Sequence, residues 1–383
     1  MPLQFINKFL HGQYSSSIVL IIATACALSL ANSPWSADYQ TLLQQHIVIS
    51  TLDLSVTYWI NDGLMVLFFL LVGLEIKREL LHGELGTLSK AAFPVVCAIG
   101  GVIVPALIFM FINKAQPAHW PGWAIPTATD IAFALGLLAL GGKNVPLSLK
   151  VFLTALAIID DLIAIIIIAL FYGEPLKIDA FFVSIAVMAG LFALNLMRIK
   201  HIWPYLLLGV FLWLSIFESG LHPTIAGVLL ALMIPIDEDR KKSPLHRLEN
   251  KLHPLSAFVI MPVFALANAG LSFTGVTPTD FLNTLPLGIM MGLFFGKQIG
   301  IILAGKIAMR MGWAQLPADI TPMQFYATAI LAGIGFTMSL FIGSLAFKSG
   351  ELDNLVRLGV MGGSLLSAVV GIALLRLCKP ATT

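Results

Sequence analysis

The sequence has few charged residues. Only 11% of its 383 residues are Asp, Glu, Lys or Arg, whereas an ordinary soluble domain has about 25%. Hydrophobic residues make up 58%, and the mean hydropathy is +0.93. This balance argues against a soluble globular protein and predicts an all-α chain that crosses a membrane many times.

Cysteine and net charge are also scarce. The three cysteines, Cys26, Cys97 and Cys378, lie far apart in apolar segments, without the spacing of a metal site or a redox motif. We therefore interpret them as helix-packing residues and expect no cofactor. A net charge of +2 is too small to indicate a nucleic-acid partner.

Long apolar runs recur along the whole chain. With about 20 apolar residues needed per span, we predict about twelve transmembrane segments in a single transporter domain, residues 1–383. The first run follows Lys8 as a cleavable signal would, but it resembles the later runs, so we expect it to be retained. The segments are centred near residues 24, 70, 102, 130, 160, 188, 209, 227, 257, 297, 336 and 366.

Basic residues predict the orientation of these segments. With the N-terminus placed inside, seventeen of the 22 basic residues fall on the inner side. The outer loops hold only Lys114, Lys177, Lys348 and Arg357, and Lys297 lies within a span. By the positive-inside rule we expect both termini in the cytoplasm.

The first outer loop has the pattern of a short β-hairpin. Residues 52–57 alternate with period two, and residues 46–49 are suited to be their antiparallel partner. An isolated hairpin is marginally stable in water. The hairpin over 46–57 therefore either pairs with that of a second copy, which predicts a homodimer, or lies on its own protein's surface.

Two adjacent carboxylates lie in the middle of an otherwise wholly apolar stretch. Asp160 and Asp161 interrupt the run from Ala155 to Phe171. An aspartate at the centre of a membrane helix costs roughly 2.5–3.5 kcal/mol on an insertion scale, so such a residue is a candidate for a functional site.

Two other segments have interrupted helical patterns at similar depth. Backbone breaks survive in a membrane only where they are buried or line a cavity. Each break is the middle of a trio, segments three to five and ten to twelve, and the trios enter from opposite sides. This arrangement predicts inverted-topology repeats with interrupted helices that cross at the midplane. The residues at the breaks are Pro126, Thr127, Thr129 and Asp130 in the fourth segment and Gly333, Gly335 and Thr337 in the eleventh.

These motifs together resemble NhaA-type sodium/proton antiporters over essentially the whole chain. The resemblance is carried by Trp59-Ile-Asn-Asp62, Leu71-Val-Gly-Leu-Glu75-Ile-Lys-Arg78-Glu79, Ala128-Thr129-Asp130, Ala157-Ile-Ile-Asp160-Asp161, Ser219-Gly-Leu-His222, Phe264-Ala-Leu-Ala-Asn268, Gly296-Lys297 and Gly333-Ile-Gly-Phe-Thr-Met-Ser339.

The resemblance implies roles for the membrane residues. Asp161 is expected to bind Na⁺ or Li⁺, with Asp160 as its neighbour in proton exchange and Thr129 as a further oxygen ligand. Successive helix positions lie about 100° apart, so the two aspartates cannot share one face. One can face the cation while the other faces a partner, and the resemblance implies that Lys297 is the partner of Asp160. Asp130 and Lys297 are expected to compensate the ends of the broken helices. Asp62 is a further membrane acid without an assigned role.

The resemblance also implies activation at alkaline pH. The expected sensor comprises the cytoplasmic loop and helix start at 236–253 together with residues of other helices. Asn250, Asp239 and Arg240 differ from the best-known family member, which leaves the pH set-point open. The loop is interpreted equally well as a solvated cytoplasmic segment. His222 is interpreted equally well as a residue that forms a structural hydrogen bond. The expected sensor residues are Glu75, Arg78, Glu79, His222, Glu249 and His253.

We therefore predict a transporter and not an enzyme, one that exchanges Na⁺ or Li⁺ for H⁺, with about two protons per sodium and membrane lipid as its surroundings. An intramembrane aspartyl protease would need two carboxylates from different helices, and the chain has no Gly-x-Gly-Asp stretch. A sodium symporter or a cation channel would keep the fold but change the coupling.

Overall fold

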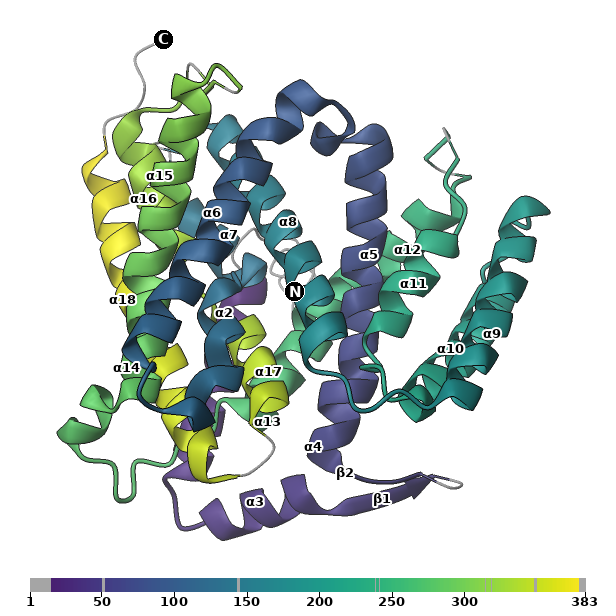
Figure 1. The fold of residues 1–383 in the computed structure, drawn as a ribbon, viewed down its shortest axis with the longest axis horizontal. Coiled ribbons are helices and arrows are strands. Elements are labelled where there is room, and N and C mark those ends of the chain that lie inside the picture. Colours follow the sequence, from purple (N-terminus) through teal and green to yellow (C-terminus); the bar gives the residue numbers. More distant parts are fainter. Residues whose placement is uncertain are drawn as a thin grey trace, which may run out of the picture. The chain divides into compact units, whose positions relative to one another are not determined.

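The computed structural model describes residues 15–49, 52–142, 145–237, 239–240, 242–313, 315–317, 319–347 and 350–378. It consists mainly of helices and contains one small sheet (Figure 1). Both chain ends, on which the predicted orientation depends, lie outside these residues. The contacts divide the chain into two compact units. The first comprises residues 1–35, 84–164 and 268–383, and the second 36–83 and 165–267. The single transporter domain over residues 1–383 stays a prediction.

The described helices fit a multi-pass membrane protein. Eight are long and apolar enough to cross a membrane, and ten if each of two bent pairs counts as one span. The predicted segments near residues 209 and 227 are shorter, namely α10 (Trp203–Ser219) and α11 (Ile225–Met233). The chain turns between them at Gly220, whose φ of +88° is readily adopted only by glycine. The twelve-span topology therefore stays a prediction.

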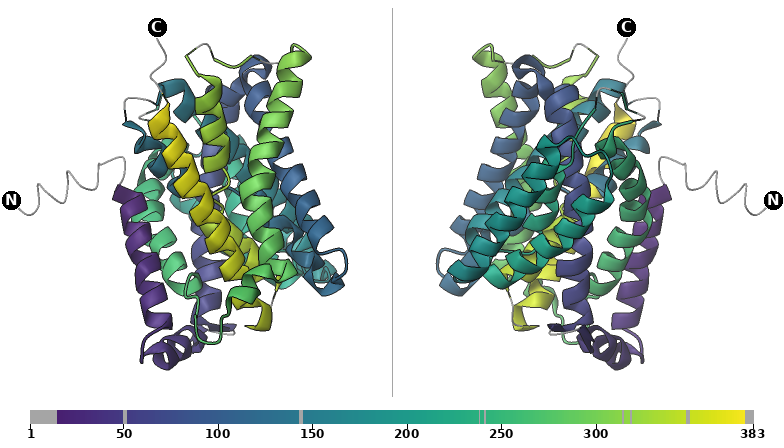
Figure 2. Two further views of the ribbon diagram at one scale, coloured as in Figure 1. Left: turned by 90° about the vertical axis from the view of Figure 1, so that its left-hand side faces the viewer. Right: turned by 90° about the vertical axis from the view of Figure 1, so that its right-hand side faces the viewer.

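The first unit holds the interrupted helices. Within it α18 runs beside α14 and α16 (Figure 2), and α15 packs along α6. Its helices are α2 (Ser15–Ala31), η2 (Glu84–Gly86), α6 (Leu88–Ile112), η3 (Pro117–Thr127), α7 (Ile131–Ala139), most of α8 (Leu147–Phe171), η6 (Pro278–Leu282), α14 (Thr284–Met291), η7 (Gly292–Gly296), α15 (Lys297–Arg310), α16 (Pro322–Leu331), α17 (Phe336–Ala346) and α18 (Gly350–Leu377).

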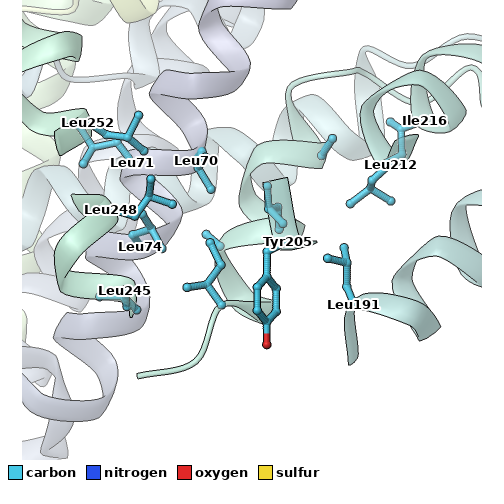
Figure 3. Close-up of a cluster of buried hydrophobic side chains, with 14 residues drawn as sticks. Leu70, Leu71, Leu74, Leu191, Tyr205, Leu212, Ile216, Leu245, Leu248 and Leu252 are labelled. Atoms are coloured by element: carbon cyan, nitrogen blue, oxygen red, sulfur yellow. The ribbon is translucent and has the colours of Figure 1, made fainter. Parts of the chain in front are cut away.

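The second unit contains the sheet. A cluster of buried side chains, with Tyr205 and Leu212 of α10 among leucines of α5, α9 and α12, forms its core (Figure 3). Besides α10 and α11, its elements are α3 (Ser36–Gln44), β1 (His46–Ile49), β2 (Leu52–Ser55), α4 (Val56–Tyr58), η1 (Trp59–Leu64), α5 (Met65–His82), α9 (Ile178–Leu196), α12 (Pro244–Leu255), η5 (Ser256–Ile260) and α13 (Met261–Asn268).

The predicted hairpin is present but shorter than expected. Strands β1 and β2 are antiparallel, with Ile47 opposite Leu54 and Val48 opposite Asp53. The sheet ends at Ser55, whose side chain accepts a hydrogen bond from the Tyr58 backbone N–H and so caps α4. Positions 56–57 are therefore helical rather than part of the strand, and residues 50 and 51 lie outside the described part of the chain.

Candidate functional site

Both predicted breaks are present, and they contact each other within the first unit. The fourth segment is a 3₁₀ helix, η3, up to Thr127, then an extended stretch, then α7 from Ile131. Pro121 and Pro126 lie inside η3, where each lacks the backbone N–H that a regular helix would use. The eleventh segment is broken between Leu331 and Phe336. The Asp130 backbone N–H donates to the Ile334 carbonyl at 2.6 Å.

Asp130 caps two helix starts at once. Its carboxylate accepts hydrogen bonds from the Phe133 N–H of α7 (3.0 Å) and from the Thr337 N–H of α17 (3.1 Å). The Thr337 hydroxyl donates to the same carboxylate. A negative charge at two helix N-termini is favoured by both helix dipoles. Asp130 is completely buried, so these backbone donors take the place of water around it.

Hydroxyl groups satisfy the carbonyl ends of the two breaks. Ser339 of α17 donates to the Ile125 carbonyl at 2.7 Å, and the Thr129 hydroxyl lies 2.8 Å from the Ala332 carbonyl. Each broken segment therefore supplies a hydroxyl to a carbonyl of the other. Ser364 of α18 accepts from the Phe336 N–H at 3.1 Å. This last residue was not singled out in the sequence, where a serine in an apolar helix has no distinctive pattern.

Lys297 pairs with Asp160 next to this crossing. Its Nζ donates to Asp160 Oδ2 at 2.5 Å, and both side chains are fully buried. The Thr129 hydroxyl lies 2.6 Å from the same oxygen. Asp160 is therefore the residue that Lys297 contacts, the partner that the resemblance implied. Lys297 contacts this carboxylate, and its compensation of the helix ends stays a prediction.

Asp161 follows Asp160 in α8 and is also buried, at 1% exposure. The next position of an α-helix lies about 100° further round, so the two carboxylates leave α8 in different directions. Carboxylate, hydroxyl and carbonyl oxygens are the ligands that hard cations prefer. The first unit brings these groups together with a buried ammonium and can therefore hold either a cation or protons.

Charged residues of the expected sensor gather at one end of α5, in the second unit. Arg78 contacts Glu79 at 3.0 Å and Glu249 of α12 at 3.1 Å. Glu75 interacts electrostatically with Arg78, Glu79 and Glu249. His253, about one turn of α12 beyond Glu249, is exposed. In the predicted loop and helix start at 236–253, the helix begins at Pro244, and residues 238 and 241 lie outside the description.

His222 does not belong to this cluster. It lies 3.1 Å from Asp62 of η1, and both side chains are buried. Asp62 and Arg78 are sixteen positions apart on one nearly continuous helix, or about 24 Å at 1.5 Å per residue. The sequence grouped His222 with the sensor residues by resemblance and gave Asp62 no role. The structure instead makes these two residues partners.

Similarity to known proteins identifies the family of this chain. The family model described as Na⁺/H⁺ antiporter 1 matches residues 7–375. Proteins named Na⁺/H⁺ antiporter NhaA from Paramagnetospirillum magneticum and Rhodospirillum rubrum are 49% and 50% identical, over 100% of this chain and 99% and 100% of their own lengths. An antiporter named NhaA 2 from Pseudomonas syringae pv. tomato is 52% identical over 97% of this chain and 95% of its own. The chain therefore belongs to the Na⁺/H⁺ antiporter 1 family of membrane transporters.

Proposed function

We propose that the protein exports Na⁺ or Li⁺ in exchange for H⁺ across a bacterial inner membrane. The observation that supports this most directly is the buried group of Asp160, Asp161, Thr129 and Lys297 beside two broken helices. The relatives' names also support it. A carboxylate that has bound a proton is a poor cation ligand, so the two ions compete for Asp161.

The ion pair gives this competition an electrical consequence. If both aspartates, or one aspartate and Lys297, release protons for each sodium bound, about two protons are exchanged per Na⁺. One net charge then crosses the membrane, and the potential contributes about 2.3 kcal/mol per 100 mV. Exchange by this route is electrogenic. Asp160 Oδ1 is buried without a hydrogen-bond partner among the described residues, which makes it a candidate proton carrier.

The remaining parts of the proposal concern architecture and regulation. Twelve spans with inverted repeats would place the broken helices at mid-membrane, where access can alternate around a fixed site. The charged group of Glu75, Arg78, Glu79 and Glu249, with His253 nearby, would adjust activity at alkaline pH. Both termini would lie in the cytoplasm, and the hairpin would join two copies.

Exchange in everted vesicles tests the proposal. A quenched pH dye should dequench on addition of NaCl or LiCl and not of KCl, across a pH series. Asp161→Asn should abolish the response, because the amide neither titrates in this range nor supplies a negative ligand. Retained exchange in this variant would refute the assigned site. Further quenching of the dye on addition of NaCl, which reports proton entry together with Na⁺, would indicate symport. Na⁺ flux without a change in the dye signal would indicate a channel.

A further inference from the structure

The chain reaches Lys297 through a π-helical turn. Helix α14 ends at Met291, η7 runs from Gly292 to Gly296, and α15 begins at Lys297. The Lys297 backbone N–H donates to the Gly292 carbonyl, five residues back. A π turn accommodates one residue more than an α turn and is common at functional sites. It therefore rotates all later side chains by about 100° relative to the preceding helix.

The turn packs tightly against prolines of two neighbouring helices. A Cβ atom at Gly292 would lie 2.6 Å from the Cβ of Pro126, in the broken segment η3. One at Gly296 would lie 2.7 Å from the Cα of Pro105, in α6. Real side chains do not approach so closely, so both positions require glycine. This contact fixes the place of the turn but does not supply hydrogen bonds to it.

Two polar side chains form hydrogen bonds at the turn. The Gln298 Nε2 donates to the carbonyl of Phe294, inside the turn, at 2.7 Å. Its Oε1 accepts a hydrogen bond from the Tyr326 hydroxyl of α16 at 2.8 Å. Because a π turn shifts the backbone bonding register, it leaves a carbonyl without its usual N–H. A buried amide one residue after Lys297 is well placed to provide a donor.

We propose that Gln298 and Tyr326 are positioning residues, which hold the π turn in the register that directs Lys297 at Asp160. The ammonium reaches Asp160 Oδ2 only if α15 has this rotation, and a relaxed α turn would point the side chain elsewhere. This inference rests on the proposed function only for its effect on transport. The geometry itself can be tested by stability.

A double-mutant cycle separates positioning from general packing. Gln298→Leu should lower the melting temperature of the purified protein in detergent by about 2–4 °C more in the natural background than in Lys297→Met. Lys297→Met has no ammonium, so in that background the rotation of α15 no longer decides whether an ion pair with Asp160 forms. Equal lowering in both backgrounds, or no lowering at all, would overturn the proposal. Tyr326→Phe, which removes one oxygen, is the second variant if Gln298→Leu does not fold.

The control is another interhelical hydrogen bond between buried side chains. The Ser184 and Ser215 hydroxyls lie 3.0 Å apart in the second unit, and Ser184→Ala should be additive with Lys297→Met. In vesicles, Gln298→Leu should shift the pH profile of exchange in the same direction as Lys297→Met, whereas Ser184→Ala should not. An unshifted profile would overturn the link to transport. If the natural protein shows no exchange, the proposed function is refuted. The melting temperatures of the variants then still test whether Gln298 positions Lys297.

Discussion

At the scale of single residues, the shared hydroxyl of Thr129 is the most informative contact. It has one proton and lies within hydrogen-bonding distance of two acceptors, Asp160 Oδ2 and the Ala332 carbonyl. It cannot donate to both at once. With Asp160 ionised, the hydroxyl can donate to it and leave Ala332 available to a cation. With Asp160 protonated, the carboxylic acid can donate to the hydroxyl, which then donates to Ala332.

Replacing this hydroxyl should weaken cation binding. Thr129→Val keeps the shape but removes the hydroxyl oxygen that is expected to serve as a ligand of the cation. We expect the Na⁺ concentration for half-maximal dequenching to rise about tenfold, with Thr129→Ser close to the natural protein. Equal values for valine and serine variants would show that the hydroxyl takes no part.

The Lys297–Asp160 pair should behave as a buried ion pair. Lys297→Met removes one partner and leaves the other charge buried, which typically costs about 3–5 kcal/mol. Adding Asp160→Asn removes that charge, so the double variant should melt at a higher temperature than Lys297→Met alone. Thermal unfolding in detergent at alkaline pH measures this. A double variant that melts lower still would contradict the pairing.

At the scale of elements, the sequence predicted the breaks but not the bonds that stabilise them. Proline, glycine and hydroxyl residues in apolar segments mark a break locally. The cross-contacts, such as Ser339 with Ile125 and Ser364 with Phe336, depend on tertiary placement. The π turn η7 was also missed, because it has no distinct pattern and reads as continuous helix. Helix α3 was missed since its composition is polar.

Asp130 provides a test of the crossing at this scale. Asp130→Ala removes the acceptor for both α7 and α17, whereas Asp130→Asn keeps one side-chain oxygen. A lost cap costs about 0.5–2 kcal/mol, so alanine should lower the melting temperature more than asparagine. Thr337→Val, which removes only the hydroxyl donor, should have the smallest effect. A loss for asparagine as large as that for alanine would show that a single side-chain oxygen does not cap these helices, and would contradict the capping role of Asp130.

At the scale of the whole molecule, the two units contain different groups of charged residues. The first holds the Lys297–Asp160 ion pair and the two broken helices. The second holds the hairpin and the charged group of α5 and α12, which comprises Glu75, Arg78, Glu79 and Glu249. The residues of all these features were identified as candidates from the sequence. The resemblance grouped His222 with this charged group. Linear motifs do not show that Asp62, which His222 contacts, and Arg78 lie far apart along one long helix.

The hairpin tests whether two molecules assemble. Val48 of β1 is 66% exposed and apolar, and its strand is an edge that a second copy could extend. Val48→Lys places a charge on that edge and should convert a dimer to a monomer, measured as molar mass by light scattering in detergent. Leu282→Lys, at a residue 70% exposed in η6, is the control and should leave the mass unchanged. Sodium-driven dequenching should persist in both variants, because the ion site lies within one chain. A Val48→Lys variant that keeps the dimer mass would place the contact between copies elsewhere.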